Sequence, residues 1–181
     1  RSRLALRQDI QYVGFTGRCA KQKDPMTFLK IAKQVISLRD DVEFLYIGDG
    51  DLEDSMKEWI EQHQLSEKIH MLGFRNDSAE IVGALDIYLS TALYEGLPYS
   101  MIEAMRAGVP IIATNCIGNN ELVFERINGL LFPVRDIESG SKCIISQIEN
   151  KLISRENAVS TYASVFSVEK MMDSLQRVYR K

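Results

Sequence analysis

The segment from residue 94 to residue 110 holds the densest group of residues that could bind a phosphorylated ligand. Pro98 suits the first position of a helix, because the N–H that proline lacks is not needed there. Gly108 followed by Pro110 indicates the end of that helix. A helix N-terminus offers free N–H donors and a positive dipole end, which together suit a phosphate. The N–H groups expected at this end are those of Tyr99, Ser100 and Met101.

Two glutamates flank this predicted helix start. Glu95 lies in the loop before the helix, and Glu103 lies one to two turns inside it, eight positions further along the chain. Carboxylates are poor ligands for phosphate but good acceptors for sugar hydroxyl groups. Glu103 by itself could be a surface residue of the helix, but its apolar neighbours make a wholly solvated position less favoured. The pair therefore indicates a ligand that carries both phosphate and hydroxyl groups.

A second candidate site directly follows the first predicted strand. Gly17 permits a tight turn there, and Arg18 and Lys23 could converge on an anion from opposite sides of the loop. Arginine can bind phosphate through two parallel hydrogen bonds, whereas lysine acts as a point charge. On position and spacing alone, a basic loop exposed to solvent is the favoured interpretation.

Two further loops are weaker candidates. The run Gly48-Asp49-Gly50 looks like the start of a dinucleotide-binding fingerprint, but the third glycine of that motif is missing. A turn with a helix N-cap at Asp51 is the favoured interpretation of this loop. The segment 116–121 follows another predicted strand, and taken alone it is best interpreted as a plain turn.

The elements that position these loops alternate between short apolar runs and amphipathic stretches. The predicted strands span Tyr12–Thr16, Val42–Ile47, Ile69–Leu72, Ile87–Ser90, Ile111–Thr114 and Gly129–Phe132. The predicted helices span Pro25–Leu38, Leu52–Gln62, Ser78–Ala84, Pro98–Ala107, Ile137–Ile148, Ser154–Ala163 and Ser167–Arg180. This alternation predicts a Rossmann-like α/β fold, a parallel sheet with helices on both faces. Such sheets bind ligands at the carboxyl ends of their strands, where the candidate loops lie.

Composition and charge exclude several classes of protein. The 181 residues are 45% hydrophobic and 26% charged, which is typical of one globular domain. The net charge of −3 argues against a nucleic-acid partner. Neither the cysteines (Cys19, Cys116 and Cys143) nor the histidines (His63 and His70) show metal-ligand spacing, so no metal site is expected. No apolar run reaches membrane-spanning length and no signal-peptide apolar region is evident. The odd number of cysteines argues against a disulfide framework, so a reducing compartment is expected.

Taken together and in this order, the motifs resemble the C-terminal domain of the family 4 retaining glycosyltransferases, which have the GT-B fold. The resemblance spans nearly the whole chain, and its core is the pair of glutamates Glu95 and Glu103. Each motif alone is unspecific, but their order makes the combination specific. The motifs are Gly17-Arg18 with Lys23, Gly48-Asp49-Gly50, Leu72-Gly73-Phe74, Glu95-Gly96-Leu97-Pro98, Glu103-Ala104-Met105, Ala107-Gly108-Val109-Pro110, Glu121, and Asn128-Gly129-Leu130-Leu131-Phe132.

The resemblance implies a role for each candidate residue. Arg18 and Lys23 would hold the diphosphate of the donor and stabilise charge on the leaving group, without a metal ion or other cofactor. Glu95 would contact the transferred sugar, whereas Glu103 would bind the ribose hydroxyl groups. The N–H groups that follow Pro98 would hold phosphate. The other donor-binding positions would be Gly17, Tyr99 and Ser100, together with Phe74 and Arg75 near the base.

The chain departs from the family pattern in two loops. Many members have Glu-Lys-Gly where this chain has Gln22-Lys23-Asp24, although both cationic residues of the first loop are present. The pair of glycines that is usual after the fifth strand is replaced by Gly118-Asn119. Each departure changes a loop that contacts the donor in the family.

The resemblance also implies what the chain does and what it lacks. Residues 1–181 would form one nucleotide-sugar-binding domain, and the N-terminal domain that holds the acceptor would be absent. The first residue is arginine rather than methionine, which fits a fragment of a longer protein, inactive alone. The complete enzyme would transfer a hexosyl group with retention from a UDP- or GDP-sugar to a growing polysaccharide or a glycolipid. It would work in the cytoplasm, with peripheral association at the inner membrane face.

Three other functions fit parts of the sequence. A nucleotide-sugar epimerase can have the same two-domain fold, but the two glutamates combined with Arg18 and Lys23 favour transfer. A non-catalytic nucleotide-binding module would not need to retain the full set of site residues. A nicotinamide dehydrogenase is the most distant alternative, because the third glycine of its fingerprint is missing.

Overall fold

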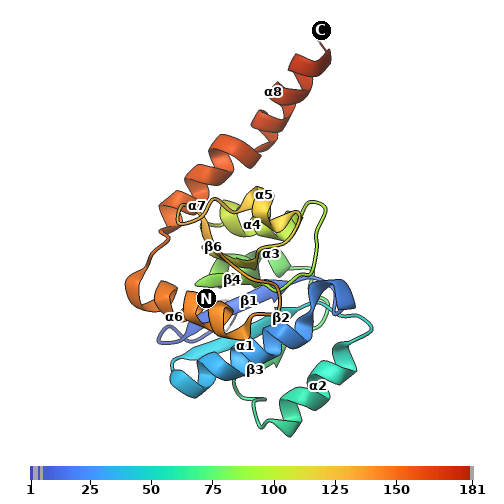
Figure 1. Ribbon diagram of the computed structural model, residues 1–181, viewed down its shortest axis with the longest axis vertical. Coiled ribbons are helices and arrows are strands. Elements are labelled where there is room, and N and C mark those ends of the chain that lie inside the picture. The colour runs from blue at the N-terminus through green and yellow to red at the C-terminus, as the bar shows by residue number, and fades with distance from the viewer. Residues whose placement is uncertain (2–3, 5, 180–181) are drawn as a thin grey trace.

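The computed structural model describes residues 1, 4 and 6–179 and contains a six-stranded parallel sheet in the order β3-β2-β1-β4-β5-β6 (Figure 1). The strands are β1 (Gln11–Thr16), β2 (Val42–Ile47), β3 (Ile69–Met71), β4 (Ile87–Ser90), β5 (Ile111–Thr114) and β6 (Gly129–Phe132). The strand order reverses between β1 and β4, which are neighbours in space but not in sequence. Open α/β sheets bind ligands beyond the carboxyl ends of the strands at such a point.

The strands are buried on both faces because helices cover the sheet on both sides. Every residue of β2, β4 and β5 is buried, as expected for the inner strands of a parallel sheet. Helices α1 (Pro25–Leu38) and α6 (Ile137–Asn150) pack together on one face. Helices α3 (Ser78–Ala84) and α4 (Tyr99–Arg106) pack on the other face, as Figure 1 shows. The predicted Rossmann-like fold is therefore confirmed.

Aromatic side chains fill the layer between α1 and the sheet. The Phe28 ring lies edge-on to the rings of Phe44 and Tyr46, with centroid distances of 5.8 and 5.4 Å. Edge-to-face contacts of this kind are favoured by the charge distribution of aromatic rings. At the α1–α6 contact, a Cβ atom on Gly140 would lie 2.6 Å from the Ile31 side chain. The absence of a side chain at position 140 thus allows the two helices to approach closely.

The remaining helices are short or lie at the edges of the domain. They are α2 (Glu53–Gln62), α5 (Asn119–Leu122), α7 (Arg155–Thr161), α8 (Val168–Tyr179), the 3-10 helix η2 (Lys21–Lys23) and the π-helix η3 (Tyr162–Phe166). The sequence did not predict α5, η2 or η3, because a single turn of helix carries too little periodicity to be recognised. The predicted end of the last helix at Arg180 lies outside the described residues.

Two predicted helix starts were wrong in detail. Helix α2 begins at Glu53 with Leu52 as its N-cap, and no side chain caps it, so the predicted cap at Asp51 is not formed. Helix α4 begins at Tyr99, and Pro98 is its N-cap rather than its first residue. Because proline has no N–H to contribute, both positions are compatible with it, and the sequence could not distinguish them.

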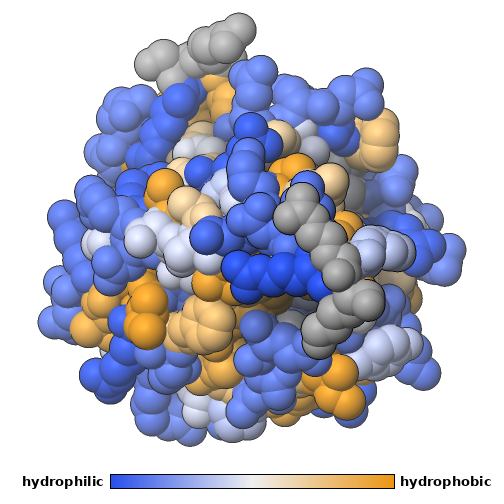
Figure 2. Space-filling model, turned by 90° about the horizontal axis from the view of Figure 1, so that it is seen from above, coloured by the Kyte–Doolittle hydropathy of each residue, from blue (hydrophilic) through white to orange (hydrophobic). Residues whose placement is uncertain are grey.

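Helix α8 extends away from the rest of the domain at the end of the described chain (Figure 1). None of its residues is buried, although it has an apolar side formed by Val168, Met171, Met172, Leu175 and Val178. Figure 2 shows the molecule from above, and on that face hydrophobic side chains are interspersed with hydrophilic ones. In the part of the chain that the structure describes, no helix has both the length and the apolar character needed to cross a bilayer.

Candidate functional site

Loops from four strands meet at the carboxyl edge of the sheet. The loop after β1 carries Gly17 and Arg18, and the loop after β4 carries Glu95 and leads into α4. Because β1 and β4 are hydrogen-bonded neighbours, these two loops lie side by side at the reversal point of the sheet. The loops after β2 and β5 flank them. The structure therefore places the catalytic residues predicted from sequence at the position that the fold favours for a ligand.

The loop after β2 supports the loop after β1 by close backbone packing. A Cβ atom on Gly48 would collide with the carbonyl oxygen of Gly17, and one on Gly50 would lie 2.9 Å from the carbonyl oxygen of Cys19. The Cys19 N–H donates to the Asp49 carbonyl oxygen at 2.7 Å. Both glycines of this run also have positive φ angles, which disfavour other residues. This packing gives the glycines of the motif a structural role.

Lys23 forms an ion pair with Glu95 across the two loops. The Glu95 side chain is only 7% exposed and that of Lys23 is 20% exposed, so the pair is largely shielded from water. The Gln22 side-chain amide donates to the second carboxylate oxygen of Glu95 at 3.4 Å and to the Tyr94 carbonyl oxygen at 3.0 Å. An ionised glutamate at position 22 could not donate this hydrogen bond, whereas the glutamine amide can.

Backbone and hydroxyl contacts hold the η2 segment against the loop after β4. The Thr91 hydroxyl lies 2.9 Å from the carbonyl oxygen of Lys23 and 3.1 Å from that of Asp24. The Leu93 N–H donates to the carbonyl oxygen of Gln22 at 2.8 Å. These contacts position Lys23 beside Glu95.

Arg18 differs from Lys23 in its surroundings. Its side chain is exposed and makes no hydrogen bond or ion pair with any described residue. Its carbonyl oxygen, in contrast, accepts a hydrogen bond from the buried Tyr46 hydroxyl at 3.1 Å. The backbone at Arg18 is thus held in place while the guanidinium is available to an anion. That Arg18 and Lys23 hold a phosphate stays a prediction: the Arg18 side chain has no partner among the described residues, whereas Lys23 is engaged by Glu95.

The first turn of α4 offers fewer free donors than the sequence predicted. The Tyr99 N–H donates to the Leu97 carbonyl oxygen at 2.9 Å, and the Met101 N–H donates to the Pro98 carbonyl oxygen at 3.0 Å. Within residues 1, 4 and 6–179, the Ser100 N–H has no such backbone acceptor. Of the three predicted donors, Ser100 is therefore the one that remains available to a phosphate.

Glu103 is exposed on α4, although its apolar neighbours had disfavoured a wholly solvated position. The neighbours Ala104 and Met105 are buried, because consecutive positions of a helix point in different directions and these two face the core. Burial raises the pKa of Tyr88 above its ordinary value, and the charges of Glu95 and Glu103 raise it further. Tyr88 lies in β4, and the chain leaves this strand through the Glu95 loop and enters α4, which carries Glu103.

Phe74 and Arg75 lie further from this centre. They follow β3, which is the edge strand and is separated from β1 by β2. Phe74 is 72% exposed. Two nitrogens of Arg75 each donate to a carboxylate oxygen of Asp77 at 2.7 Å, and these hydrogen bonds lower the pKa of Asp77. The structure leaves Phe74 available to a ligand at the rim, while Arg75 is already paired.

The loop after β5 contacts Glu95 directly, which the sequence did not predict. The Glu95 N–H donates to the Ile117 carbonyl oxygen at 2.9 Å. Gly118 has a φ angle of +89°, and a Cβ atom there would lie 2.5 Å from the Glu95 carbonyl oxygen. The Asn119 side chain is fully buried and donates to the Thr114 carbonyl oxygen at 3.1 Å. The glycine followed by asparagine after a strand is the sequence feature that could have indicated this contact, but the same pair is also common in plain turns.

We expect Gly118→Ala to destabilise the domain by about 1–3 kcal/mol, because it combines an unfavourable φ angle with a clash against Glu95. Gly96→Ala is the matched control in the neighbouring loop, since a Cβ atom there would meet nothing within 4 Å. Urea unfolding of both variants measures the difference. Equal free energies of unfolding for the two variants would contradict the proposed contact.

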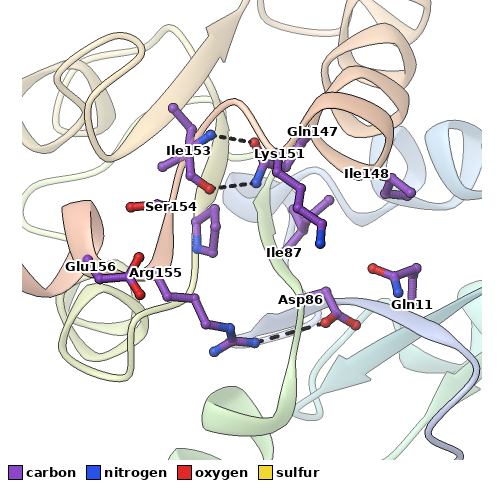
Figure 3. Close-up of a pocket in the computed structure, with 11 residues that line it drawn as sticks. Gln11, Asp86, Ile87, Gln147, Ile148, Lys151, Ile153, Ser154, Arg155 and Glu156 are labelled. Atoms are coloured by element: carbon purple, nitrogen blue, oxygen red, sulfur yellow. Dashed lines mark hydrogen bonds and ion pairs between the residues drawn. The ribbon is translucent and has the colours of Figure 1, made fainter.

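A cavity of about 390 Å³ lies at the opposite edge of the sheet, where the strands begin (Figure 3). Its polar groups largely bond to one another. The Gln147 side chain donates to and accepts from the backbone of Ile153, with both distances at 2.9 Å. Arg155 pairs with Asp86 at 4.0 Å and donates to the Leu85 carbonyl oxygen at 2.6 Å. These contacts join the end of α6 to the start of α7 and give the cavity a structural role.

In the described part of the chain, no three His, Cys, Asp or Glu side chains form a group that could hold a metal ion. The groups at the carboxyl edge that could bind a ligand include the Arg18 and Lys23 side chains, the Glu95 and Glu103 carboxylates and the Ser100 N–H. The fold and this edge define a Rossmann-like domain suited to an anionic ligand that carries hydroxyl groups.

The chain belongs to the family described as glycosyl transferases group 1, which matches residues 1–164. It is 30% identical to the Escherichia coli UDP-Gal:alpha-D-GlcNAc-diphosphoundecaprenol alpha-1,3-galactosyltransferase, over 97% of this chain and 47% of that protein. It is 24% identical to the Staphylococcus aureus poly(ribitol-phosphate) alpha-N-acetylglucosaminyltransferase, over 92% of this chain and 35% of that protein. The chain thus spans about half, or less, of the length of these curated relatives.

Solved structures with the GT-B fold match the chain. Anabaena HepE in complex with UDP and glucose has a TM-score of 0.83 at 23% identity, over 95% of this chain and 48% of that chain. The pneumococcal O-GlcNAc transferase GtfA in complex with UDP and GlcNAc has a TM-score of 0.85 at 21% identity, over 95% of this chain and 36% of that chain. At these identities the match establishes the fold.

Proposed function

We propose that this chain binds the nucleotide-diphosphate sugar of a retaining glycosyltransferase of the family 4 type. The observation that carries the proposal is the meeting of Arg18, the Lys23–Glu95 pair and the start of α4 at the reversal point of the sheet. Diphosphate requires positive groups, and ribose and hexose hydroxyl groups require acceptors. Membership of the group 1 family and the UDP bound by structural neighbours support this assignment.

The proposed chemistry is stabilisation of a diphosphate leaving group. As the bond between the sugar and the diphosphate breaks, negative charge grows on the diphosphate. Arg18, Lys23 and the Ser100 N–H would stabilise this charge, supported by the dipole of α4. Glu95 would contact the transferred sugar and Glu103 would bind the ribose. We propose that two cations and a helix terminus take the place of a divalent metal ion.

For Lys23 to contact the diphosphate, its ion pair with Glu95 has to loosen. The incoming phosphate would then replace the carboxylate as the partner of Lys23, and Glu95 would turn to the hydroxyl groups of the sugar. After the exchange Lys23 is paired with the phosphate and Glu95 accepts hydrogen bonds from the sugar hydroxyl groups, so neither group is left without a partner. Glu95 would thus have two successive partners, first Lys23 and then the sugar.

We further propose that residues 1–181 are the donor-binding, C-terminal domain of a two-domain enzyme. The matched relatives are about twice as long or longer. Exposed apolar side chains surround the site, namely Tyr94, Leu97, Tyr99 and Ile117, and such a rim suits contact with a second domain or an acceptor. On this proposal the chain alone binds nucleotide without transferring sugar. The complete enzyme would act on a growing polysaccharide or a glycolipid at the cytoplasmic face of the membrane.

Calorimetric titration of the chain with UDP, GDP and ADP, with and without magnesium, tests the binding proposal. We expect micromolar-to-millimolar binding of one diphosphate, unchanged by magnesium. The matching nucleoside without phosphate is the control, and it is expected to bind far more weakly because it lacks the groups that Arg18 and Lys23 would contact. Absence of binding by all three diphosphates would contradict donor binding, and binding that requires magnesium would contradict the metal-independent mechanism.

Product analysis of the longer, two-domain protein tests the reaction. Transfer with retention leaves the anomeric configuration of the donor sugar in the product, which NMR spectroscopy of the new linkage can measure. Release of an epimerised sugar would indicate an epimerase of the same fold instead. Nucleotide binding with neither product would indicate a non-catalytic module.

A further inference from the structure

Tyr88 lies beneath the candidate site, where its hydroxyl group joins two of the segments that form it. It is a residue of β4, and its side chain is fully buried. Its hydroxyl oxygen lies 2.8 Å from the Ser100 hydroxyl oxygen and 3.1 Å from the Thr16 carbonyl oxygen. The Thr16 N–H in turn points to the same phenol oxygen at 3.4 Å. One hydroxyl group thus contacts both the end of β1 and the start of α4.

The two segments that meet at this hydroxyl carry different parts of the proposed phosphate site. Thr16 is the last residue of β1 and is followed directly by Gly17 and Arg18. Ser100 lies in the first turn of α4, and its N–H is the donor there without a backbone partner among residues 1, 4 and 6–179. A diphosphate held by both segments requires a defined distance between them, because charged hydrogen bonds are short and directional.

We propose that Tyr88 is a positioning residue for the donor diphosphate. Its hydroxyl sets the spacing between the Arg18 loop and the first turn of α4, so that both can contact one ligand. This inference rests on the proposed function, since it assumes that a diphosphate binds at the carboxyl edge of the sheet. It adds a residue that touches no donor atom and acts through Thr16 and Ser100.

The surroundings of Tyr88 hold its side chain in a fixed position, as a positioning role requires. The ring lies 5.9 Å from the Phe15 ring, and β1 and β5 pair with its backbone on either side. Burial keeps the phenol protonated, because it raises the pKa of Tyr88 above the ordinary tyrosine value. The single phenol proton can be donated to one oxygen at a time, and the Ser100 hydroxyl can serve as either donor or acceptor, so the three groups can be satisfied together.

Tyr88→Phe removes the hydroxyl group and leaves the buried ring in place. We expect its affinity for UDP, measured by calorimetric titration, to fall by about 3- to 10-fold, the range for loss of one hydrogen-bonded hydroxyl. The affinity for uridine should be unchanged, because uridine lacks the diphosphate. This contrast between UDP and uridine is a readout that a merely structural role would not produce.

Tyr12→Phe is the matched control. Tyr12 is also a buried tyrosine, but its hydroxyl accepts a hydrogen bond from the Arg7 N–H at 3.1 Å at the start of β1, away from the site. We expect this variant to bind UDP as the unaltered chain does. The double variant Tyr88→Phe/Ser100→Ala should bind UDP no more weakly than the worse single variant, because the two hydroxyl groups act as one unit.

The outcomes separate this inference from the proposed function. If the unaltered chain fails to bind UDP and the other diphosphates, the proposed function fails and the role of Tyr88 fails with it. If the unaltered chain binds UDP and Tyr88→Phe binds it equally well, only the positioning role is overturned. An equal loss in Tyr12→Phe, or independent losses in the double variant, would also overturn it.

Discussion

A Lys23→Met variant is expected to lose about 3 kcal/mol of its free energy of unfolding. The Glu95 side chain is only 7% exposed, and the Lys23 ammonium is its ion-pair partner. Methionine keeps the apolar stem of lysine and removes the charge, so Glu95 would remain as a shielded carboxylate with only the Gln22 amide at 3.4 Å. Leaving such a charge without a cation is costly. Urea unfolding followed by circular dichroism measures the loss.

The double variant Lys23→Met/Glu95→Gln is expected to recover most of this stability, because it removes both charges together. Lys142→Met is the matched control. Lys142 pairs with Glu138, and both side chains are about 70% exposed, so we expect no measurable change. Unfolding of Lys23→Met at the same urea concentration as the unaltered chain would show that the ion pair contributes little.

Arg18→Ala is expected to weaken the binding of nucleoside diphosphate by about 1.5–3 kcal/mol, as for loss of a charged hydrogen bond. Lys23→Ala should weaken it by a similar amount. Because the Arg18 side chain has no partner among the described residues, its removal should leave the free energy of unfolding unchanged. Calorimetric titration with UDP measures the affinity, and urea unfolding checks the fold.

Lys21→Ala is the control for general electrostatic attraction. Lys21 is exposed and lies in the same loop, so it contributes the same charge at a position that the proposal does not place in the site. Its replacement should change UDP affinity little, and the small change should disappear at high salt. Unchanged affinity in both Arg18→Ala and Lys23→Ala would remove these residues from the diphosphate site.

Much of the fold could be predicted from the sequence because its signals are local. The strands β2, β4, β5 and β6 have the bounds that their apolar runs predicted, and α1 and α3 have the bounds that their periodicity predicted. The spacing of apolar residues is a property of neighbouring positions in the chain, so a single sequence contains it. The elements that the sequence missed are single turns, such as α5 and η2, where that periodicity is too short.

The carboxyl edge of the sheet could also be predicted as the candidate site, and Arg18, Lys23, Glu95 and Glu103 were assigned to it from residue type and spacing. The family of the chain confirms that these motifs indicate a glycosyl transferase of group 1. The roles of the individual residues remain predictions. Phe74 and Arg75 were also assigned, but the order of the strands places them two strands from β1.

The sequence by itself therefore determined the fold class, most of the elements and the edge at which chemistry is expected. Only the tertiary structure decided which side chains meet there. Lys23 and Glu95 are 72 positions apart in sequence, and Tyr88 and Thr16 are equally far apart. Such pairs form because the chain reverses its strand order between β1 and β4. Contacts across that reversal depend on packing of the whole sheet, and local periodicity carries no information about them.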